Sequence, residues 1–173
     1  MNDRPKFIVD QNVGKLAKLL RLLGYDTLFF TGETDTQMVD IALTEARVIL
    51  TRDTHLLERR AAVSGQIKII LLNSDDIDKQ IRQVVIDLHL DAFQPFTLCL
   101  EDNHHLIART REEVDNRVPP YIWKTQTEYV ECPECHRIYW KGTHWDAMTR
   151  RLKKIIQDTR EEKPWNSTTG TVN

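Results

Sequence analysis

Cysteine and long apolar runs are both scarce in this sequence, and each shortage excludes a class of protein. The three cysteines cannot all pair with one another, and two stand in Cys132-Pro133-Glu134-Cys135, a spacing that favours a metal-binding knuckle over a disulfide framework. No stretch approaches the ~20 apolar residues that span a bilayer, and the polar start of the chain does not resemble a secretory signal. We therefore expect a soluble protein without a membrane partner, in the reducing cytoplasm.

The net charge is also small. There are 24 Lys and Arg residues against 26 Asp and Glu residues, which gives a formal charge of −2. A polyanionic partner would therefore have to be held by a local basic patch or through bound cations. A length of 173 residues with 40% hydrophobic content suffices for one ordinary core and a smaller satellite.

Short β-rich runs alternate with segments of helical period in the first half of the chain. Four strands are expected, at residues 7–9, 27–30, 48–50 and 67–72. The helix signals include a stop at Gly24, a capping box at residues 34–37 and a cap at Ser74. This alternation is typical of a parallel sheet covered by helices, so the predicted fold class is α/β.

The helical period ends near Pro95, and this break divides the chain. We assign residues 1–95 to the α/β domain, residues 96–158 to a smaller unit, and residues 159–173 to a disordered tail. The smaller unit begins with a polar, irregular stretch. Its later part is expected to hold two short strands on either side of the cysteine pair and a last helix capped by Thr143.

Acidic residues follow several of the predicted strands. Asp10 and Asp53 come directly after the first and third strands, and Asp35 opens the helix after the second. Because the carboxyl ends of parallel strands share one edge of a sheet, we expect these carboxylates to gather there, with Asp75 or Asp76 as a further member. Such carboxylates repel one another unless a cation neutralises them, and Mg²⁺ or Mn²⁺ suits oxygen ligands.

A metal held by aspartates supports hydrolysis of phosphodiesters, because the ion activates a water and stabilises charge on the attacking and leaving oxygens. Asn12 is a candidate for holding a metal-bound water or a phosphate oxygen. Lys15, Arg21 and Arg52 are candidates for binding a phosphate backbone, and His144 for phosphate binding or proton transfer. Plainer roles compete with these, since aspartate is a favoured helix cap and a lysine on an amphipathic helix usually faces solvent.

The second half of the chain adds residue types that bind nucleic acids. Tyr139, Trp140 and Trp145 are candidates for stacking on unpaired bases, although aromatic residues in so small a unit are more often core. Residues 150–154 hold the densest basic run, a candidate surface for a nucleic-acid backbone. Its plainer explanation is a solvated helix face.

Several motifs follow one another along the chain: Phe7-Ile8-Val9-Asp10, Gly14-Lys15-Leu16-Ala17, Leu20-Arg21-Leu22-Leu23-Gly24-Tyr25-Asp26, Thr51-Arg52-Asp53, the cysteine pair and Tyr139-Trp140-Lys141-Gly142-Thr143-His144. Together they resemble the Mut-seven C-terminal RNase family over nearly the whole chain. The resemblance implies a PIN-like, three-layer nuclease fold with a central parallel sheet, followed by a small zinc-ribbon-like unit and a C-terminal helix. It also implies cleavage of RNA, which we expect to be single-stranded.

The resemblance assigns roles to individual acids. Asp10, Asp35 and Asp53 match the family's metal-binding residues, and Asp76 lies nearest to a fourth. It therefore implies that these four aspartates are catalytic and that the first three hold Mg²⁺ or Mn²⁺.

The zinc site departs from the family pattern at one position. The family usually shows a first Cys-x-x-Cys pair, whereas here Asp102 stands where the second cysteine would be. Structural zinc takes four tetrahedral ligands, mostly Cys and His. The cysteine ligands available are Cys99, Cys132 and Cys135. The candidates for the fourth ligand are Asp102, which keeps the register, His104 and His105; a metal-free ribbon held by aromatic packing is the alternative.

Two other functional classes fit parts of the pattern. A phosphoacceptor receiver domain also carries an aspartate after its first and third strands, but here Gln11 follows Asp10 where the receiver has a second acid. A non-catalytic RNA- or protein-binding module on the same scaffold is the other alternative, and the retention of three acids argues against it. A metal-dependent ribonuclease is the function that we expect.

Overall fold

Four parallel strands form the central sheet of the protein. The computed structural model describes residues 4–90 and 94–161. The strands lie in the order β2-β1-β3-β4, and every pairing is parallel. Their bounds are β1 Lys6–Val9, β2 Thr27–Phe29, β3 Arg47–Thr51 and β4 Ile69–Leu71. The predicted α/β class with a parallel sheet is confirmed.

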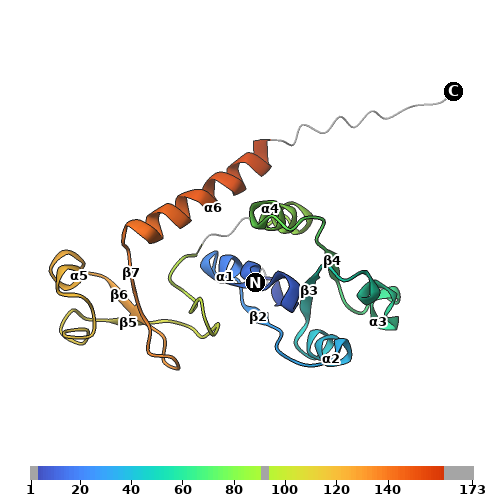
Figure 1. Cartoon of the computed structure of the whole chain (residues 1–173), viewed down its shortest axis with the longest axis horizontal. Coiled ribbons are helices and arrows are strands. Elements are labelled where there is room, and N and C mark those ends of the chain that lie inside the picture. Colours follow the sequence, from blue (N-terminus) through green and yellow to red (C-terminus); the bar gives the residue numbers. More distant parts are fainter. Residues whose placement is uncertain (1–3, 91–93, 162–173) are drawn as a thin grey trace.

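Helices cover both faces of this sheet (Figure 1). One face is covered by α1 Lys15–Leu22 and α4 Ile77–Leu88, on whose layer α6 Thr143–Glu161 packs, and the other by α2 Asp35–Glu45 and α3 Arg60–Val63. The 3₁₀ turns η1 Gln11–Val13 and η2 Thr54–Glu58 follow β1 and β3. Neighbouring residues of β1 face opposite layers: Phe7 and Val9 are buried under α1 and α4, and Ile8 under α2. This burial on both faces explains the unbroken apolar runs of the strands.

A three-stranded antiparallel sheet lies beside the first one. It contains β5 Ile107–Arg109, β6 Tyr129–Glu131 and β7 Ile138–Trp140, in that order, with the short helix α5 Pro120–Thr125 between β5 and β6. The hairpin around the cysteine pair is present as predicted, and the stretch before it is irregular as expected except for β5 and α5, which were not predicted. β5 has only three residues, which are too few to show the alternation of apolar and polar side chains that predicts a strand. Pro120 opens α5, where a missing N–H costs no hydrogen bond.

The last helix, α6, leaves the small sheet and packs on the layer formed by α1 and α4 (Figure 1). Trp145, Leu152 and Ile156 are buried in that core. The helix continues to Glu161, so the first three residues of the expected tail are helical, and residues 162–173 lie outside the described residues. No helix within the described residues is long and apolar enough to cross a bilayer.

Candidate functional site

Each of the four predicted acids follows one of the parallel strands along the chain. Asp10 follows β1, Asp53 follows β3, and Asp76 lies after β4 at the start of α4. Asp35, in the connection from β2, is the first residue of α2. Since β2, β1, β3 and β4 are neighbours in that order, the four acids follow four adjacent strand ends.

Both carboxylate oxygens of Asp10 are hydrogen-bonded. Oδ1 accepts from the backbone N–H of Gln11 at 2.6 Å. Oδ2 accepts from the side-chain amide of Asn12 at 2.8 Å and from the hydroxyl of Thr51 at 2.7 Å. Asn12 therefore lies beside Asp10, and the half-buried carboxylate is held in one orientation.

Thr51, the last residue of β3, connects Asp10 to Asp53. The threonine is fully buried, and its hydroxyl oxygen also accepts a hydrogen bond from the backbone N–H of Asp53 at 3.0 Å. Asp53 in turn caps η2 by accepting from the backbone N–H of His55 at 2.8 Å. The position of Thr51 in the sequence indicates this role, because a hydroxyl between a buried strand and an acid can bond to groups on both sides.

The two remaining acids have partners of their own. Asp35 Oδ2 accepts from Arg59 Nη2 at 3.0 Å, an ion pair that joins α2 to the end of η2. Asp76 is the N-cap of α4 and accepts from two backbone N–H groups of the first turn, both at 3.0 Å. The predicted cap at Ser74 is wrong: its hydroxyl oxygen instead accepts from the backbone N–H of Asp76 at 3.1 Å.

The predicted phosphate-binding residues are not brought together. Arg52 forms an ion pair with Asp75, and Lys15 is exposed at the start of α1. The structure corrects the expected position of Arg21, because this side chain is buried between α1 and the small unit rather than on a surface. Its guanidinium donates hydrogen bonds of 2.8 to 2.9 Å to the carbonyl oxygens of Thr27, Leu100 and Glu101. Arg21 is therefore not available to bind a phosphate backbone, because the small unit covers it.

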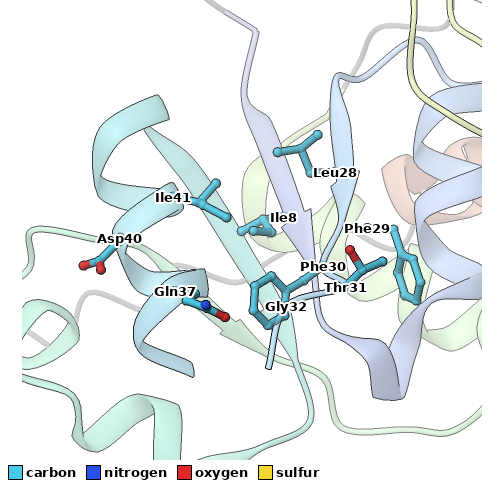
Figure 2. A pocket seen from close by; sticks show the side chains of 9 residues that line it. All are labelled: Ile8, Leu28, Phe29, Phe30, Thr31, Gly32, Gln37, Asp40 and Ile41. Atoms are coloured by element: carbon cyan, nitrogen blue, oxygen red, sulfur yellow. The ribbon is translucent and has the colours of Figure 1, made fainter. Parts of the chain in front are cut away.

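A hollow of about 510 Å³ lies beside β2 and α2 (Figure 2). Figure 2 shows the ring of Phe30 next to Gln37 and Gly32 in its wall. A Cβ at Gly32 would lie 2.5 Å from that ring, so glycine permits the close approach. Among the residues that line this hollow there is one acid, Asp40, and none of the predicted site residues. The hollow therefore does not extend the acidic edge.

The first cysteine of the small unit begins a tight turn. The backbone N–H of Cys99 donates to the carbonyl of His104 at 2.8 Å, and the N–H of Asn103 donates back to the carbonyl of Cys99 at 3.1 Å. Asn103 has φ 69°, in the left-handed region that asparagine tolerates better than most residues. Asp102 directly precedes this residue.

The Cys-x-x-Cys motif makes the same turn. The N–H of Cys132 donates to the carbonyl of Arg137 at 3.0 Å, the N–H of His136 donates to the carbonyl of Cys132 at 3.1 Å, and His136 has φ 57°. By this correspondence Asp102 holds the position in the first turn that Cys135 holds in the second.

The two turns bring four candidate ligand atoms together. The sulfur atoms of Cys99, Cys132 and Cys135 and a carboxylate oxygen of Asp102 all lie within 4.8 Å of one another. Cys99 Sγ lies 3.6 Å from Cys135 Sγ, and Cys132 Sγ lies 3.2 Å from Asp102 Oδ1. Within the described part of the chain this group can hold a metal ion, and neither His104 nor the acids of the sheet edge form so compact a group.

Burial and hydrogen bonding have opposite effects in this group. Burial raises the pKa of the Cys132 thiol. Burial also acts to raise the pKa of Asp102, but hydrogen bonds from the thiols of Cys99, Cys135 and Cys132 outweigh it and hold this pKa well below the usual range. Asp102 therefore presents a charged oxygen among the three sulfur atoms.

A buried carboxylate beside the second turn holds the small sheet together. Glu131, at the end of β6, is 3% exposed and accepts hydrogen bonds from Arg109 Nε at 2.7 Å and from both terminal nitrogens of Arg117. The hydrogen bonds from Arg117, together with those from Arg109, lower the pKa of Glu131 to about 2 although burial opposes them. One carboxylate thus joins β5 and the loop before α5 to β6.

We expect Glu131→Gln to destabilise the protein by about 3 kcal/mol at pH 7, because two guanidinium groups lose their charged partner. The folded pKa of about 2 lies below the ~4.3 of an unfolded glutamate, so this stabilisation is complete above about pH 4.3 and is lost as the pH falls toward 2. Denaturant unfolding of both proteins at pH 7 and pH 3 measures the effect. If the free energy of unfolding of the variant differed from that of the wild type by the same amount at pH 7 and at pH 3, the charge of Glu131 would contribute nothing to stability.

The fold and the Cys/Asp group define the class of the molecule: an α/β protein with aspartates after its parallel strands, joined to a small sheet with a Cys/Asp group. The chain belongs to the Mut7-C RNAse domain family, whose pattern it matches over residues 5–152. This match includes both sheets and confirms the family resemblance of the sequence motifs. No curated protein and no solved structure matches the chain. The family description indicates a protein of the ribonuclease type.

Proposed function

We propose that this protein is a ribonuclease that uses Mg²⁺ or Mn²⁺, bound by aspartates at the edge of a PIN-like domain, to hydrolyse single-stranded RNA. The observation that carries the proposal is the connection of Asp10 to Asp53, from adjacent strand ends, through the buried hydroxyl of Thr51. Membership in a family described by an RNAse domain supports RNA as the substrate.

The donor set suits a hard divalent cation. Asp10 and Asp53 offer carboxylate oxygens, and Oδ2 of Asp53 has no hydrogen bond to another described residue. Asp35 and Asp76, from the two outer strand connections, complete the set of ligands that we propose. A bound ion would supply an activated water and stabilise the charge of the leaving oxygen. The residues that we propose to hold phosphate oxygens near this edge are Asn12, which is hydrogen-bonded to Asp10, and the exposed Lys15.

We also propose that the Cys/Asp group holds zinc and makes the small unit a zinc ribbon. Zn–S bonds of about 2.3 Å in a tetrahedral site place sulfur atoms about 3.8 Å apart, and the Cys99 to Cys135 spacing of 3.6 Å is close to this value. Of the candidates for the fourth ligand we choose Asp102, because its turn repeats the turn of the Cys-x-x-Cys motif.

The nuclease proposal is tested with an end-labelled single-stranded RNA, the DNA of the same sequence and the RNA duplex. We expect the full-length protein to cut the single-stranded RNA when Mg²⁺ or Mn²⁺ is added, and the rate to fall about 100-fold or more when divalent ions are removed by dialysis. Cleavage that persists unchanged without divalent ions would contradict the metal mechanism. The absence of cleavage of every substrate with both ions would contradict the nuclease proposal.

A further inference from the structure

A pocket of about 380 Å³ in the small unit has no role in the proposed hydrolysis. It lies between β7, α5 and the start of α6, and its volume is within the range of about 300 to 1,000 Å³ that is usual for small-molecule sites. Its main aromatic and apolar lining residues are Tyr121, Ile122, Tyr139, Trp140, Trp145 and Met148. None of the four aspartates at the sheet edge lines it.

The aromatic residues of this pocket differ in how far they are buried, from Trp145, which is buried, to Tyr121, which is exposed. Trp145 is buried and stacks on Phe96, with ring centroids 3.8 Å apart. A Cβ at Gly142 would lie 3.1 Å from Nε1 of Trp140, so the glycine permits the indole to lie close to the backbone. Tyr121 of α5 is 73% exposed. An exposed aromatic ring in the same pocket as buried and half-buried aromatic rings suits a flat ligand that stacks.

Polar side chains also line the pocket, and two of them, Thr143 and His144, are exposed. The side chains of Gln126, Thr143 and His144 line the pocket and make no hydrogen bond to another described residue, and the same holds for the indole N–H of Trp140. Together they offer both donors and acceptors. An aliphatic side chain of a protein partner would leave these groups unused, whereas a nucleobase has both π faces and a hydrogen-bonding edge.

A groove that shares Met148 with the pocket runs along α1. Met148 lines both the pocket and a groove of about 580 Å³, whose lining runs over α1 to Gly14 and Phe29 near the ends of β1 and β2. The groove has basic side chains: Lys18 is paired with Glu101 and Arg151 with Asp78, and Lys15 is exposed. A strand with its phosphates in this groove would have one end at the acidic edge and a base at the pocket.

We propose that the pocket binds one unpaired nucleobase of an RNA strand, at a distance along the strand from the bond that is cut. This inference rests on the proposed ribonuclease function, because that function supplies the RNA. The base stacks on Tyr121 and Trp140, and Gln126 or His144 reads its edge. The pocket makes the protein prefer strands with an unpaired base at a fixed distance from the scissile phosphate.

The experiment measures binding of a fluorescent decamer of uridines to the full-length protein without added divalent ions, so that no turnover takes place. An abasic site is moved along the decamer one position at a time. We expect one or two abasic positions to weaken binding about 10-fold, and Tyr121→Ala to weaken binding of the intact decamer by a similar factor. In decamers that lack the sensitive base, Tyr121→Ala should have no further effect. Tyr121→Phe should retain binding, and Val63→Ala, an exposed apolar residue of α3, is the matched control.

Three results would overturn the proposal. Equal affinity for every abasic decamer would mean that phosphates alone are bound. An equal loss for intact and abasic decamers in Tyr121→Ala would mean that this ring does not act through the base. Binding of an apolar peptide that decamer RNA cannot displace would assign the pocket to a protein partner. Failure of the ribonuclease proposal gives a different result, namely no cleavage with added ions while the abasic pattern of binding remains.

Discussion

Asp10→Asn is expected to lower the rate of metal-dependent RNA cleavage about 100-fold or more while leaving the protein folded. The change removes one negative charge from the proposed ion site, and an ion contributes several kcal/mol of transition-state stabilisation to phosphodiester hydrolysis. Asparagine has nearly the same shape, and its carbonyl oxygen can still accept the hydrogen bond from the N–H of Gln11. The loss of unfolding free energy should therefore remain near 1 kcal/mol.

The measurement is single-turnover cleavage of a labelled single-stranded RNA at several Mn²⁺ concentrations, with unfolding followed in parallel. Asp115→Asn is the matched control, because Asp115 is exposed in the loop before α5 and the same charge is removed. We expect the control to cleave at the wild-type rate. Full activity of Asp10→Asn at low Mn²⁺ would remove Asp10 from the mechanism, and unfolding of the variant would shift the test to Asp53→Asn.

The parallel sheet was predictable because its signals are local. Apolar strands alternate with helical segments, and the capping box of α2 at Thr34 and Gln37 is present in the structure. β5 and α5 were missed for the opposite reason. β5 pairs with β6 across some twenty residues of intervening chain, so it depends on a partner that its own three residues do not reveal.

The site was predictable in position but not in detail. The order of the strands places Asp10 and Asp53 on neighbouring strand ends, as expected from the parallel arrangement. The hydroxyl of Thr51 lies between them because β1 and β3 pair in a register that sets Val9 beside Leu50. The sequence of a single strand does not reveal this register. The burial of Arg21 was not predictable for the same reason. It depends on the turn at Leu100 and Glu101, about eighty residues further along the chain.

The prediction with the largest effect on folding concerns the Cys/Asp group. Cys132→Ser should reduce bound zinc from about one ion per chain to nearly none and unfold the small sheet, because zinc binding supplies on the order of 10 kcal/mol to small domains of this kind. Cys132 is fully buried, and its backbone also closes the second turn. The parallel sheet has its own core on both faces, so its strands should keep their amide protection in hydrogen exchange.

Asp102→Cys separates loss of metal from damage to the fold. The substitution places a fourth thiolate in the turn that already repeats the Cys-x-x-Cys geometry, so we expect it to retain zinc and to release it at a higher chelator concentration than the wild type. Elemental analysis and hydrogen exchange of the three proteins give both readouts. Less than about 0.1 zinc per chain in the wild type would contradict the zinc site. If the wild type held no metal and Cys132→Ser still unfolded the small sheet, the buried sulfur would act through packing alone.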